Sequence, residues 1–514
     1  MNYPVWDVAF GAGLLMAIVS ILHVFVSHFA VGGGLFLVLT ERRARRTGDD
    51  ALLAWLKLHT KFFVLVTVVF GAVSGVGIWF TIALINPTAT ANLIHAFVWG
   101  WAIEWVFFFL EITAALLYLY GWEKLDARLH EWYGWIYFAN ALASMVIING
   151  ILTFMLTPGS WITNHAFWSG FFNPTYFPSL LARIAIALAL AGIYALLTAA
   201  RQVDPALKSR LVRWSGSWIL PSLAVLPACI WWYARTIPVS HWAAVHGSMP
   251  TATVFAWNAM RFGAATFLVA LATQIKPSRL PFAASLLLAV LAFCTMGSFE
   301  FVREAVRKPF IIADYLYGNS LYAKPVPGDA GFTADRINQA GILATAKWVE
   351  GRTISPSAPA RAGAEIFRVE CQSCHTRDAY RGVRAWLFGR QWNKEEIAAM
   401  LTGLDLMHGG IMPPFAGTDS ERLALAAWLD EVRGPLPPPP APDGAAVFQR
   451  HCSVCHQGES TASAITCFSG MDAASIAGAL TSLPAFNPRM PDLHLSDADL
   501  AALAGWIQTR AARP

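Results

Sequence analysis

ILHVFVSHFAVGGGLFLVLTERRARR, residues 21–46, is an apolar run that ends in a cluster of arginines. A helix needs about 20 consecutive apolar residues to cross the hydrocarbon core of a bilayer, and this run extends back to residue 7. Further runs of spanning length follow it. We predict eight membrane-spanning helices, over about residues 7–40, 60–85, 96–121, 132–157, 179–200, 215–235, 252–274 and 280–302. The sequence therefore predicts an all-α, polytopic membrane bundle in residues 1–310.

The composition of the whole chain agrees with a membrane protein. Of its 514 residues, 56% are hydrophobic and 13% are charged, whereas soluble domains carry about 25% charged residues. This balance excludes a soluble enzyme and a disordered chain. The formal net charge of +5 follows the loops between the spans, so it needs no nucleic acid to explain it.

Lysine and arginine mark one side of the predicted bundle. The opposite loops, 86–95, 158–178 and 236–251, carry neither residue type. The loops after the first, third, fifth and seventh spans carry Arg42, Arg43, Arg45, Arg46, Lys57, Lys124, Arg128, Arg201, Lys208, Arg210, Arg213, Lys276 and Arg279. Basic loops stay on the cytoplasmic side. We expect a bacterial inner-membrane protein whose N-terminus, and whose residues after about 303, lie in the periplasm.

A short motif occurs twice after residue 325, where the chain becomes more polar. The copies are GAEIFRVECQSCH (363–375) and GAAVFQRHCSVCH (444–456), and each precedes an amphipathic helical pattern, around Trp428 and Trp506. A repeated motif indicates a repeated structural unit. We predict a connecting segment, 311–357, two small all-α domains, 358–434 and 444–514, and a proline-rich linker between them, 435–443.

Each copy ends in C-x-x-C-H, the attachment signature of c-type haem. In this motif two thiols bond to the haem vinyl groups, and the adjacent histidine binds the iron. A redox-active or zinc-binding C-x-x-C is the alternative, but two copies in the same helical frame favour haem. We predict two covalent haems c, held by Cys371, Cys374 and His375 and by Cys452, Cys455 and His456.

The sixth iron ligand in such domains is usually a methionine, which raises the reduction potential. Met412 in GGIMPPFAG and Met490 in NPRMPDL lie on proline-containing loops just before the last helix of each domain. We predict that they are these ligands. The competitors are Met407, His408 and His494, and His451 is expected at the surface beside the haem edge.

Ionisable side chains inside the apolar runs are candidate functional residues, since a charge in a bilayer is costly. They are His23, His28, His95, Glu104, Glu111, Arg183, Arg261, Glu300, Arg303 and Glu304. Each has a structural alternative. A membrane histidine can pack with a hydrogen bond, and a glutamate near a helix end can extend its carboxylate to water. Arg183 and Arg261 either neutralise propionates or acidic groups, or pack against helix-end carbonyls.

Four stretches resemble subunit I of the cytochrome bd quinol oxidases. They are ILHVFVSHFAVGGGLFLVLTE; KFFVLVTVVFGAVSGVGIWF; AIEWVFFFLEITAALLYLYGWEKL, which runs into HEWYGWIYFANALASMVIINGILTFMLTPGSW; and GSFEFVREAVRKPF. The pair of membrane glutamates in the third stretch is the most specific part. Together with the haem motifs, the chain resembles a bd-type subunit I with a C-terminal fusion of two class I-type cytochrome c domains.

The resemblance implies roles at five positions. His23 matches a first-helix histidine that binds a high-spin haem at the oxygen-reducing site. Glu104 and Glu111 match two glutamates near the catalytic haem, implicated in haem ligation and proton delivery. Glu304 matches a glutamate ligand of the high-spin haem b, and Arg307 matches an arginine that can pair with a haem propionate. The implied membrane cofactors are one or two non-covalent high-spin haems, b or d.

Other positions depart from the family's pattern. The family binds a low-spin haem b through a histidine in its fifth helix and a methionine in its seventh. This sequence has Ala182 and Arg183 at the first of these places and Gly263 at the second, with Met260 one turn away. We therefore expect that haem to be absent or bound differently. The family's long quinol-binding loop is reduced to a short segment around His241 and His246. Its ninth helix is missing, and direct quinol oxidation is not expected.

These features favour a bd-like terminal oxidoreductase that reduces oxygen with electrons passed through the fused cytochromes, with nitric oxide as the alternative acceptor. A second reading is a non-catalytic membrane subunit that relays electrons between a membrane donor and a periplasmic enzyme or cytochrome. A third is a structural anchor for a dihaem cytochrome. The resemblance implies a second membrane subunit, and the expected donor is a periplasmic cytochrome c or another redox protein.

Overall fold

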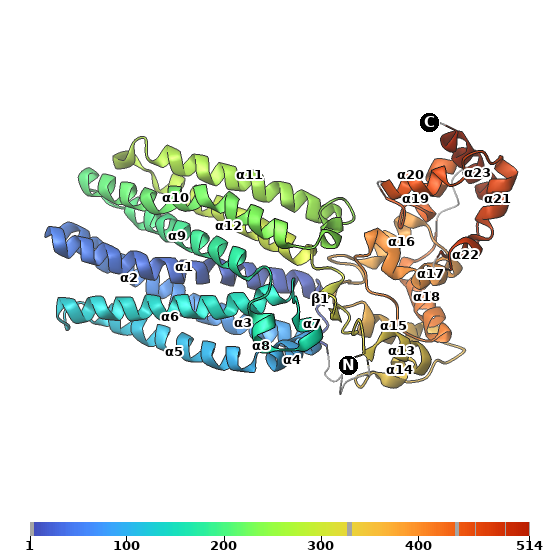
Figure 1. Cartoon of the computed structure of the whole chain (residues 1–514), viewed down its shortest axis with the longest axis horizontal. Coiled ribbons are helices and arrows are strands. Elements are labelled where there is room, and N and C mark those ends of the chain that lie inside the picture. Colours follow the sequence, from blue (N-terminus) through green and yellow to red (C-terminus); the bar gives the residue numbers. More distant parts are fainter. Residues whose placement is uncertain (1–4, 326–331, 437–441, 458, 489, 513–514) are drawn as a thin grey trace.

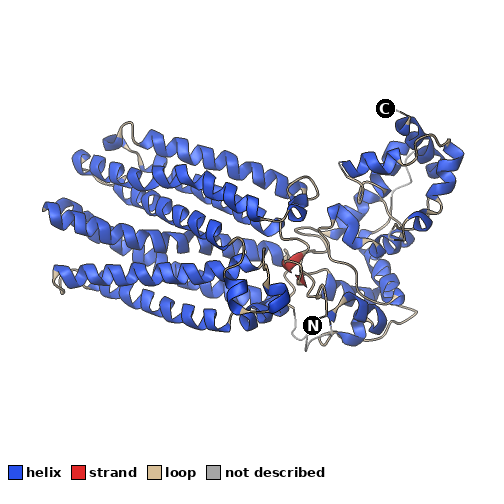
Figure 2. Ribbon diagram, viewed as in Figure 1, coloured by secondary structure: helices blue, strands red, loops and turns tan. Residues whose placement is uncertain are grey.

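The computed structural model of the chain describes residues 5–325, 332–436, 442–457, 459–488 and 490–512. Long helices lie side by side in one bundle, and a region of shorter helices is attached at one end of it (Figure 1). Regular structure in the described residues is helical apart from one small antiparallel hairpin (Figure 2). This confirms the predicted all-α class. Residues 437–441 of the predicted linker lie outside the described residues.

Eight helices among the described residues are long and apolar enough to cross a membrane, which confirms the predicted number of spans. They are α1 (Ala12–Thr47); the span Asp50–Ile85, made of α2 (Asp50–Val64), η1 (Leu65–Phe70) and α3 (Gly71–Ile85); α5 (Val98–Tyr120); α6 (Ala127–Phe154); α9 (Tyr176–Ala199); α10 (Pro205–Thr236); α11 (Pro250–Thr273); and α12 (Phe282–Ala305). The short helices α4 (Pro87–Ala96), α7 (Trp161–Asn164) and α8 (Phe167–Phe171) lie at the end of the bundle nearest the C-terminal region (Figure 1).

The first helix is longer than its apolar run. It continues through the arginine cluster to Thr47, and Gly48, with a left-handed φ of 61°, closes it. The backbone hydrogen bonds of a helix do not depend on hydrophobicity, so a helix can extend beyond the bilayer core. The predicted end near residue 40 was therefore the end of the apolar run and not of the helix.

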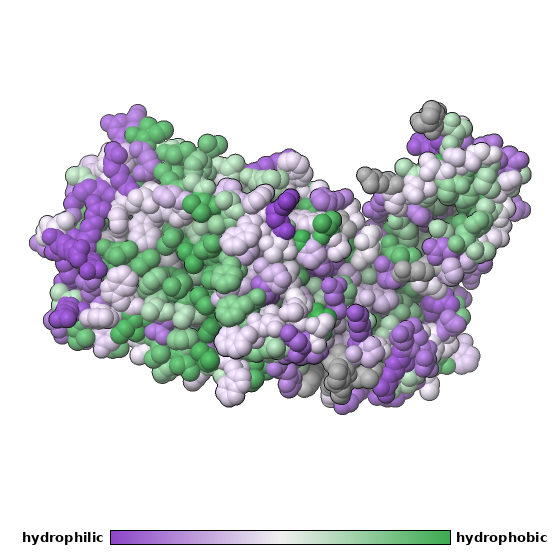
Figure 3. Space-filling model, in the orientation of Figure 1, coloured by the Kyte–Doolittle hydropathy of each residue, from purple (hydrophilic) through white to green (hydrophobic). Residues whose placement is uncertain are grey.

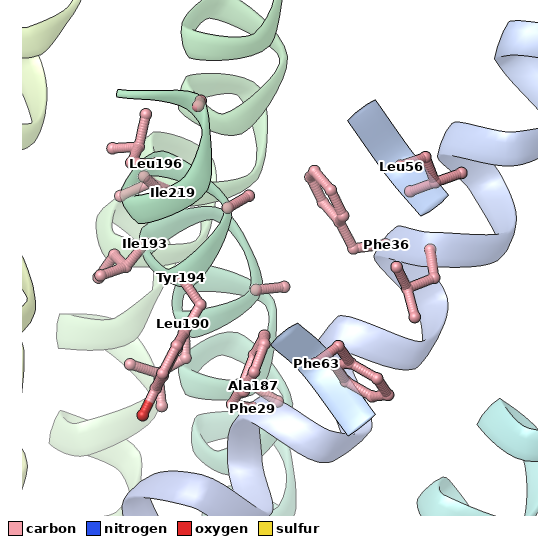
Figure 4. Close-up of a cluster of buried hydrophobic side chains, with 14 of the residues drawn as sticks. Phe29, Phe36, Leu56, Phe63, Ala187, Leu190, Ile193, Tyr194, Leu196 and Ile219 are labelled. Carbon is pink, nitrogen blue, oxygen red and sulfur yellow. The ribbon is translucent and has the colours of Figure 1, made fainter. Parts of the chain in front are cut away.

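Helix α1 packs between α9, α6 and α3. At Gly32 the backbones of α1 and α9 come so close that a Cβ atom would lie 1.9 Å from the carbonyl oxygen of Ala187. Nearby, Phe29 stacks on Tyr194 with ring centroids 3.9 Å apart, within the cluster drawn in Figure 4. This packing fixes the depth and rotation of α1, and with them the positions of its polar side chains.

The C-terminal region contains two helical units that match the two sequence copies. The hairpin β1 (Phe310–Ile312) and β2 (Leu316–Tyr317) follows α12, and α13 (Ala334–Ala340) and α14 (Ile342–Thr345) come next. The first unit contains α15 (Pro359–Glu370), α16 (Val383–Arg390), α17 (Lys394–Thr402), η5 (Leu404–Gly409) and α18 (Asp419–Arg433). The second contains α19 (Gly444–His451), α20 (Glu459–Thr466), α21 (Ala473–Leu480), α22 (Leu483–Phe486) and α23 (Asp497–Ala511).

Polar and apolar residues are separated along the bundle. Its flank is largely apolar, and hydrophilic residues gather at the end away from the C-terminal region (Figure 3). That end includes the arginine-rich last turns of α1. The basic loops and the C-terminal units therefore lie at opposite ends of the bundle, as the distribution of lysine and arginine predicts.

Candidate functional site

The two C-terminal units share one helix crossing. A Cβ atom on Gly363 of α15 would lie 2.1 Å from the carbonyl oxygen of Ala424 in α18, and one on Gly444 of α19 would lie 2.2 Å from that of Ala502 in α23. Beside each crossing an aromatic pair packs at nearly the same distance: Phe367 with Trp428, 4.6 Å between centroids, and Phe448 with Trp506, 4.9 Å. The same crossing holds both C-x-x-C-H motifs in equivalent places.

The first attachment motif lies at the C-terminal end of α15. The backbone amides of Cys374 and His375 bond to the carbonyl of Cys371, which winds the motif into tight turns. The Nδ1 atom of His375 lies 3.1 Å from the carbonyl oxygen of Arg381. A carbonyl only accepts, so Nδ1 carries the proton and Nε2 is left to bind iron. These residues fit a covalent haem c.

The second motif repeats this layout after α19. The amides of Cys455 and His456 bond to the carbonyl of Cys452. Nδ1 of His456 lies 3.3 Å from the hydroxyl oxygen of Ser460. A hydroxyl can accept the Nδ1 proton and leave Nε2 to bind iron. These residues also fit a haem c.

Both predicted methionine ligands are half-buried. Met412 packs against the hydrophobic core of the first unit, and Met490 lies between α22 and α23. The competitors have other surroundings: Met407 is 2% exposed inside that core, the His408 ring lies 3.3 Å from Gln457, and His494 is exposed. Met412 and Met490 remain the predicted ligands.

The second attachment motif is docked on the first unit. The backbone amide of His408 donates to the carbonyl of Val454, between the two cysteines of the second motif, at 2.7 Å. Arg390 donates to the hydroxyl of Ser453 at 3.1 Å. The indole of Trp392 bonds to the backbone next to that motif, donating to the carbonyl of Arg450. The loop before Met412 is thus part of the contact between the units.

The first attachment motif, in turn, lies against the membrane bundle. A Cβ atom on Gly318, in the segment after α12, would lie 3.6 Å from Sγ of Cys374. Arg381, whose carbonyl holds His375, also reaches Sδ of Met249 at 3.5 Å. At the start of α1, a Cβ atom on Gly11 would lie 3.3 Å from Thr376, the residue after the motif. The second motif therefore contacts the first unit, and the first motif contacts the end of the bundle, so the three parts are arranged in series.

His451 is not at the surface, which corrects the expectation from sequence. It is 6% exposed and lies between the two units, with Nδ1 3.5 Å from a carboxylate oxygen of Glu396. Burial lowers the pKa of His451 to about 4 and raises the pKa of Glu396. The contact is therefore a buried pair on the inter-unit boundary.

The two histidines of α1 face different helices. Nδ1 of His23 lies 3.1 Å from the hydroxyl of Ser74 in α3, and its ring is packed against Gly75, just after the π-helical segment η1. His28 is buried, and its Nε2 lies 3.4 Å from Arg183 in α9. A five-residue step turns a helix by about 140°, so the two rings do not converge.

Glu304, at the end of α12, is held by two basic side chains. One oxygen pairs with Arg307, and the other accepts from Nζ of Lys308 at 3.0 Å. As arranged, the carboxylate offers no unpaired oxygen to an iron. Arg307 is 4% exposed, and its Nε has no hydrogen-bond partner among the described residues. A buried unpaired N–H suits an additional anionic group, so Arg307 fits a propionate partner.

The two membrane glutamates of α5 both bond to α6. The hydroxyl of Ser144 donates to Glu104 at 2.9 Å, and that of Tyr137 donates to Glu111 at 3.0 Å. Glu104 and Glu111 are seven residues apart, which is about 10 Å along a helix. The structure thus places both predicted carboxylates on one face, each with a hydroxyl partner.

The residues expected at the positions of the family's low-spin haem ligands make other contacts. Arg183 is 8% exposed and bonds to Ser179 at 3.3 Å as well as to His28. Met260 is 57% exposed on α11. These residues do not fit the histidine–methionine ligation of that haem.

A buried glutamate that the sequence did not single out lies near the basic end of the bundle. Glu41 of α1 is fully buried and takes three hydrogen bonds: from Arg45 at 2.7 Å, from the Tyr118 hydroxyl at 2.8 Å and with Nδ1 of His130 at 2.8 Å. In the sequence it stands next to the arginine cluster, where it resembles an ordinary loop charge. The signal in the sequence that could have singled out Glu41 is its position one helical turn before Arg45.

Comparison with known proteins agrees with this geometry. Residues 12–226 match the family model "Cytochrome bd terminal oxidase subunit I". Residues 358–429 and 439–507 match the model "Cytochrome C oxidase, cbb3-type, subunit III". Among curated proteins no match was found.

A solved structure, described as the structure of bd oxidase from Geobacillus thermodenitrificans, shares the fold of the membrane part. Its TM-score is 0.51 at 15% sequence identity, over 59% of this chain and 89% of that one. The chain is a multi-pass membrane protein that joins a cytochrome bd oxidase subunit I domain to two cytochrome c domains of cbb3 subunit III type, which imply covalent haem c.

Proposed function

We propose that the chain is a bd-like membrane haem oxidoreductase that reduces oxygen and receives electrons through its two c-type haems rather than directly from quinol. One observation carries the proposal: the attachment motifs and the bundle are docked in series. Val454 of the second motif contacts the His408 loop of the first domain, and Cys374 of the first motif lies beside Gly318 at the bundle end. Electron transfer slows steeply with distance, so this order favours a path from the second domain through the first into the membrane.

Haem c supplies a one-electron carrier when bound, and a membrane haem supplies a centre for oxygen reduction. In the proposal each haem c has a histidine and a methionine ligand, and the membrane ligands come from α1, α5 and α12. These residues are His375 with Met412, His456 with Met490, and His23, Glu104 and Glu304, with Arg307 as the propionate partner. Glu304 can bind a haem iron only if its carboxylate breaks its ion pair with Arg307 or with Lys308.

The acid–base part of the proposal rests on α5. A carboxyl group held away from water exchanges protons through neighbouring hydroxyls. Glu111 has Tyr137 as such a neighbour, and Glu104 has Ser144. We assign Glu111 as a proton relay. Glu104 is either a ligand of the catalytic haem, as in the ligand set above, or the group that donates the proton where the acceptor is reduced.

The proposal places the protein in a bacterial inner membrane, with its N-terminus and cytochrome c domains in the periplasm. Basic loops favour the cytoplasmic side, and haem c is attached outside the cytoplasmic membrane. Members of the bd oxidase family typically work with another subunit. We propose a second membrane subunit, and a periplasmic cytochrome c or another redox protein as the electron donor.

A non-catalytic electron-transfer subunit is the second candidate. The observation in its favour is the ion pairing of both Glu304 oxygens, which leaves the match to the family's haem ligand unused. In that case a membrane haem would pass electrons on without binding a gaseous ligand.

The haem content of the purified complex distinguishes the candidates. Pyridine haemochrome spectra give haem c against non-covalent haem, and CO added to the reduced complex reports a high-spin haem. We expect two haems c per chain and a CO-reactive membrane haem. His23→Ala should remove the membrane signal and leave haem c intact, whereas His28→Gln should keep both. A membrane haem that does not bind CO supports the electron-transfer subunit. A complex that contains haem c but no membrane haem overturns both candidates.

A further inference from the structure

Helices α5 and α6 are joined by three hydrogen-bonded pairs at regular spacing. Ser144 donates to Glu104, Tyr137 donates to Glu111, and Nε2 of His130 bonds to the carbonyl oxygen of Tyr118 at 2.9 Å. Successive pairs are seven residues apart on both helices, which is about 10 Å of helix. The polar groups therefore form a ladder that runs from the basic end of the bundle toward its middle.

The pair of this ladder nearest the basic end of the bundle, His130 with Tyr118, adjoins a group that holds an exchangeable proton. Both ring nitrogens of His130 face acceptors: Nε2 faces the carbonyl of Tyr118, and Nδ1 lies 2.8 Å from a carboxylate oxygen of Glu41. A neutral imidazole donates from only one nitrogen. Either His130 is protonated on both nitrogens, or Glu41 carries a proton and donates it to Nδ1. In both arrangements the buried pair stores one transferable proton.

This pair is connected to the surface and to the ladder by different groups. Arg45, whose side chain is 28% exposed, bonds to Glu41 from the basic end. The hydroxyl of Tyr118 donates to the other oxygen of Glu41. Glu41 thus lies between a group that reaches water and a tyrosine that points into the bundle.

A small cavity separates this pair from the next one. Its volume is about 10 Å³, and Tyr118 and Tyr137 are both among the residues that line it. Glycines make the space: a Cβ atom on Gly34 would lie 2.4 Å from the Tyr137 ring, and one on Gly134 would lie 3.1 Å from the Tyr118 ring. The surface exposed in this cavity is apolar, so a water held there would lack polar partners. The space instead allows the Tyr118 or Tyr137 ring to turn, and such a turn is the step that would pass a proton between the two hydroxyls.

We infer that α1, α5 and α6 form a proton path that begins at the Glu41–His130 pair and passes through Tyr118 and Tyr137 to Glu111. The inference rests on the proposed function, because reduction of oxygen to water consumes one proton for each electron that arrives through the haems c. The path draws these protons from the side of the basic loops, opposite the cytochrome c domains. Tyr118, Tyr137, His130 and Glu41 are thereby assigned to proton transfer.

The test uses the purified complex in proteoliposomes, with a pH-sensitive dye on the basic-loop side. The reduced complex is mixed rapidly with oxygen, and proton uptake is followed together with the haem spectra. Tyr118→Phe keeps the ring and removes the hydroxyl that bonds to Glu41, and should slow proton uptake about tenfold. Glu41→Gln should slow it at least as much. Haem content and reduction of the haems c should be unchanged in both.

Tyr133→Phe is the matched control. Tyr133 is half-buried on α6 between His130 and Tyr137, and its hydroxyl has no hydrogen bond to a described residue. Its removal should leave proton uptake at the native rate. Native uptake rates in Tyr118→Phe, or uptake from the cytochrome c side, would overturn the path while leaving the proposed function standing. A native complex that lacks oxygen reduction would overturn both, and if Glu41→Gln does not assemble, the isosteric Tyr118→Phe decides.

Discussion

The backbone amide of His408, in the first cytochrome c domain, bonds to the carbonyl of Val454, between the cysteines of the second attachment motif, at 2.7 Å. The bond joins the loop that precedes Met412 to the second haem site. Both partners are backbone atoms, so this contact survives side-chain substitutions at either residue. The two domains are therefore held in a set register by their loops, and side chains adjust the strength of docking.

Arg390 is one of the side chains that bond across this contact. It donates to the carbonyl of Gln449 at 2.5 Å and to the hydroxyl of Ser453 at 3.1 Å. Each hydrogen bond is worth about 1 kcal/mol net, so Arg390→Ala should weaken docking by about 2 kcal/mol and slow electron transfer between the haems c. Rapid mixing with a reductant, followed at the absorbance of each haem c, measures the rate. Arg377→Ala, which removes an exposed pair with Asp378, should leave it unchanged.

His451 predicts an acid sensitivity of the second domain. Its pKa is lowered by burial to about 4, so between about pH 4 and pH 6.5 the unfolded chain binds more protons than the folded one. The contribution of neutral His451 to the free energy of unfolding is complete above this window. It is lost as the pH falls through the window, by up to about 3 kcal/mol. Arg450, Asp499 and Glu396 face the ring, and the raised pKa of Glu396 acts in the opposite direction.

Denaturant unfolding of the complex, followed by haem c absorbance at neutral and mildly acidic pH, measures this loss. His451→Gln should flatten the dependence, because the glutamine does not titrate. His494→Gln changes an exposed histidine and should keep the native slope. A slope that is the same with and without His451 would contradict the assignment.

The helix crossing at Gly363 predicts a large loss of stability on a small change. The Cβ atom of Gly363→Ala would lie 2.1 Å from the Ala424 carbonyl, so α15 and α18 would have to separate, at a cost of about 3 kcal/mol. Gly389→Ala is the control, because its Cβ atom meets nothing within 4 Å. It should be neutral or stabilise α16 by up to about 1 kcal/mol. Thermal unfolding monitored at haem c checks both, and equal stability in the two variants would refute the crossing.

The assignment of Met412 predicts a change in potential rather than in folding. Met412→Ala removes the proposed sulfur ligand and should lower the reduction potential of the first haem c, with the second unchanged. Met407→Leu alters the nearby methionine, which lies in the core at 2% exposure, and should leave both potentials in place. Spectroelectrochemical titration of the complex reports them. If Met407→Leu lowers the potential and Met412→Ala does not, the ligand is Met407 and not Met412.

Much of this protein is readable from local patterns. The eight spans follow from runs of apolar residues, and α1 shows the limit of that signal, since apolarity ends near residue 40 while the helix continues to Thr47. The attachment motifs were equally clear, because three ligating residues sit within five positions of sequence. His451 was misplaced, since a histidine beside a motif carries no signal for the second domain surface that covers it.

The sequence alone determined the membrane bundle, the two haem c motifs and the opposite placement of the basic loops, because length, spacing and charge are local properties of a chain. The tertiary structure alone decided that the His408 loop rests on Val454 and that Cys374 faces Gly318. It also brought Glu41 to His130 across 89 residues of chain. Such contacts depend on how helices cross and rotate against one another, which close packing settles and no single stretch of sequence encodes.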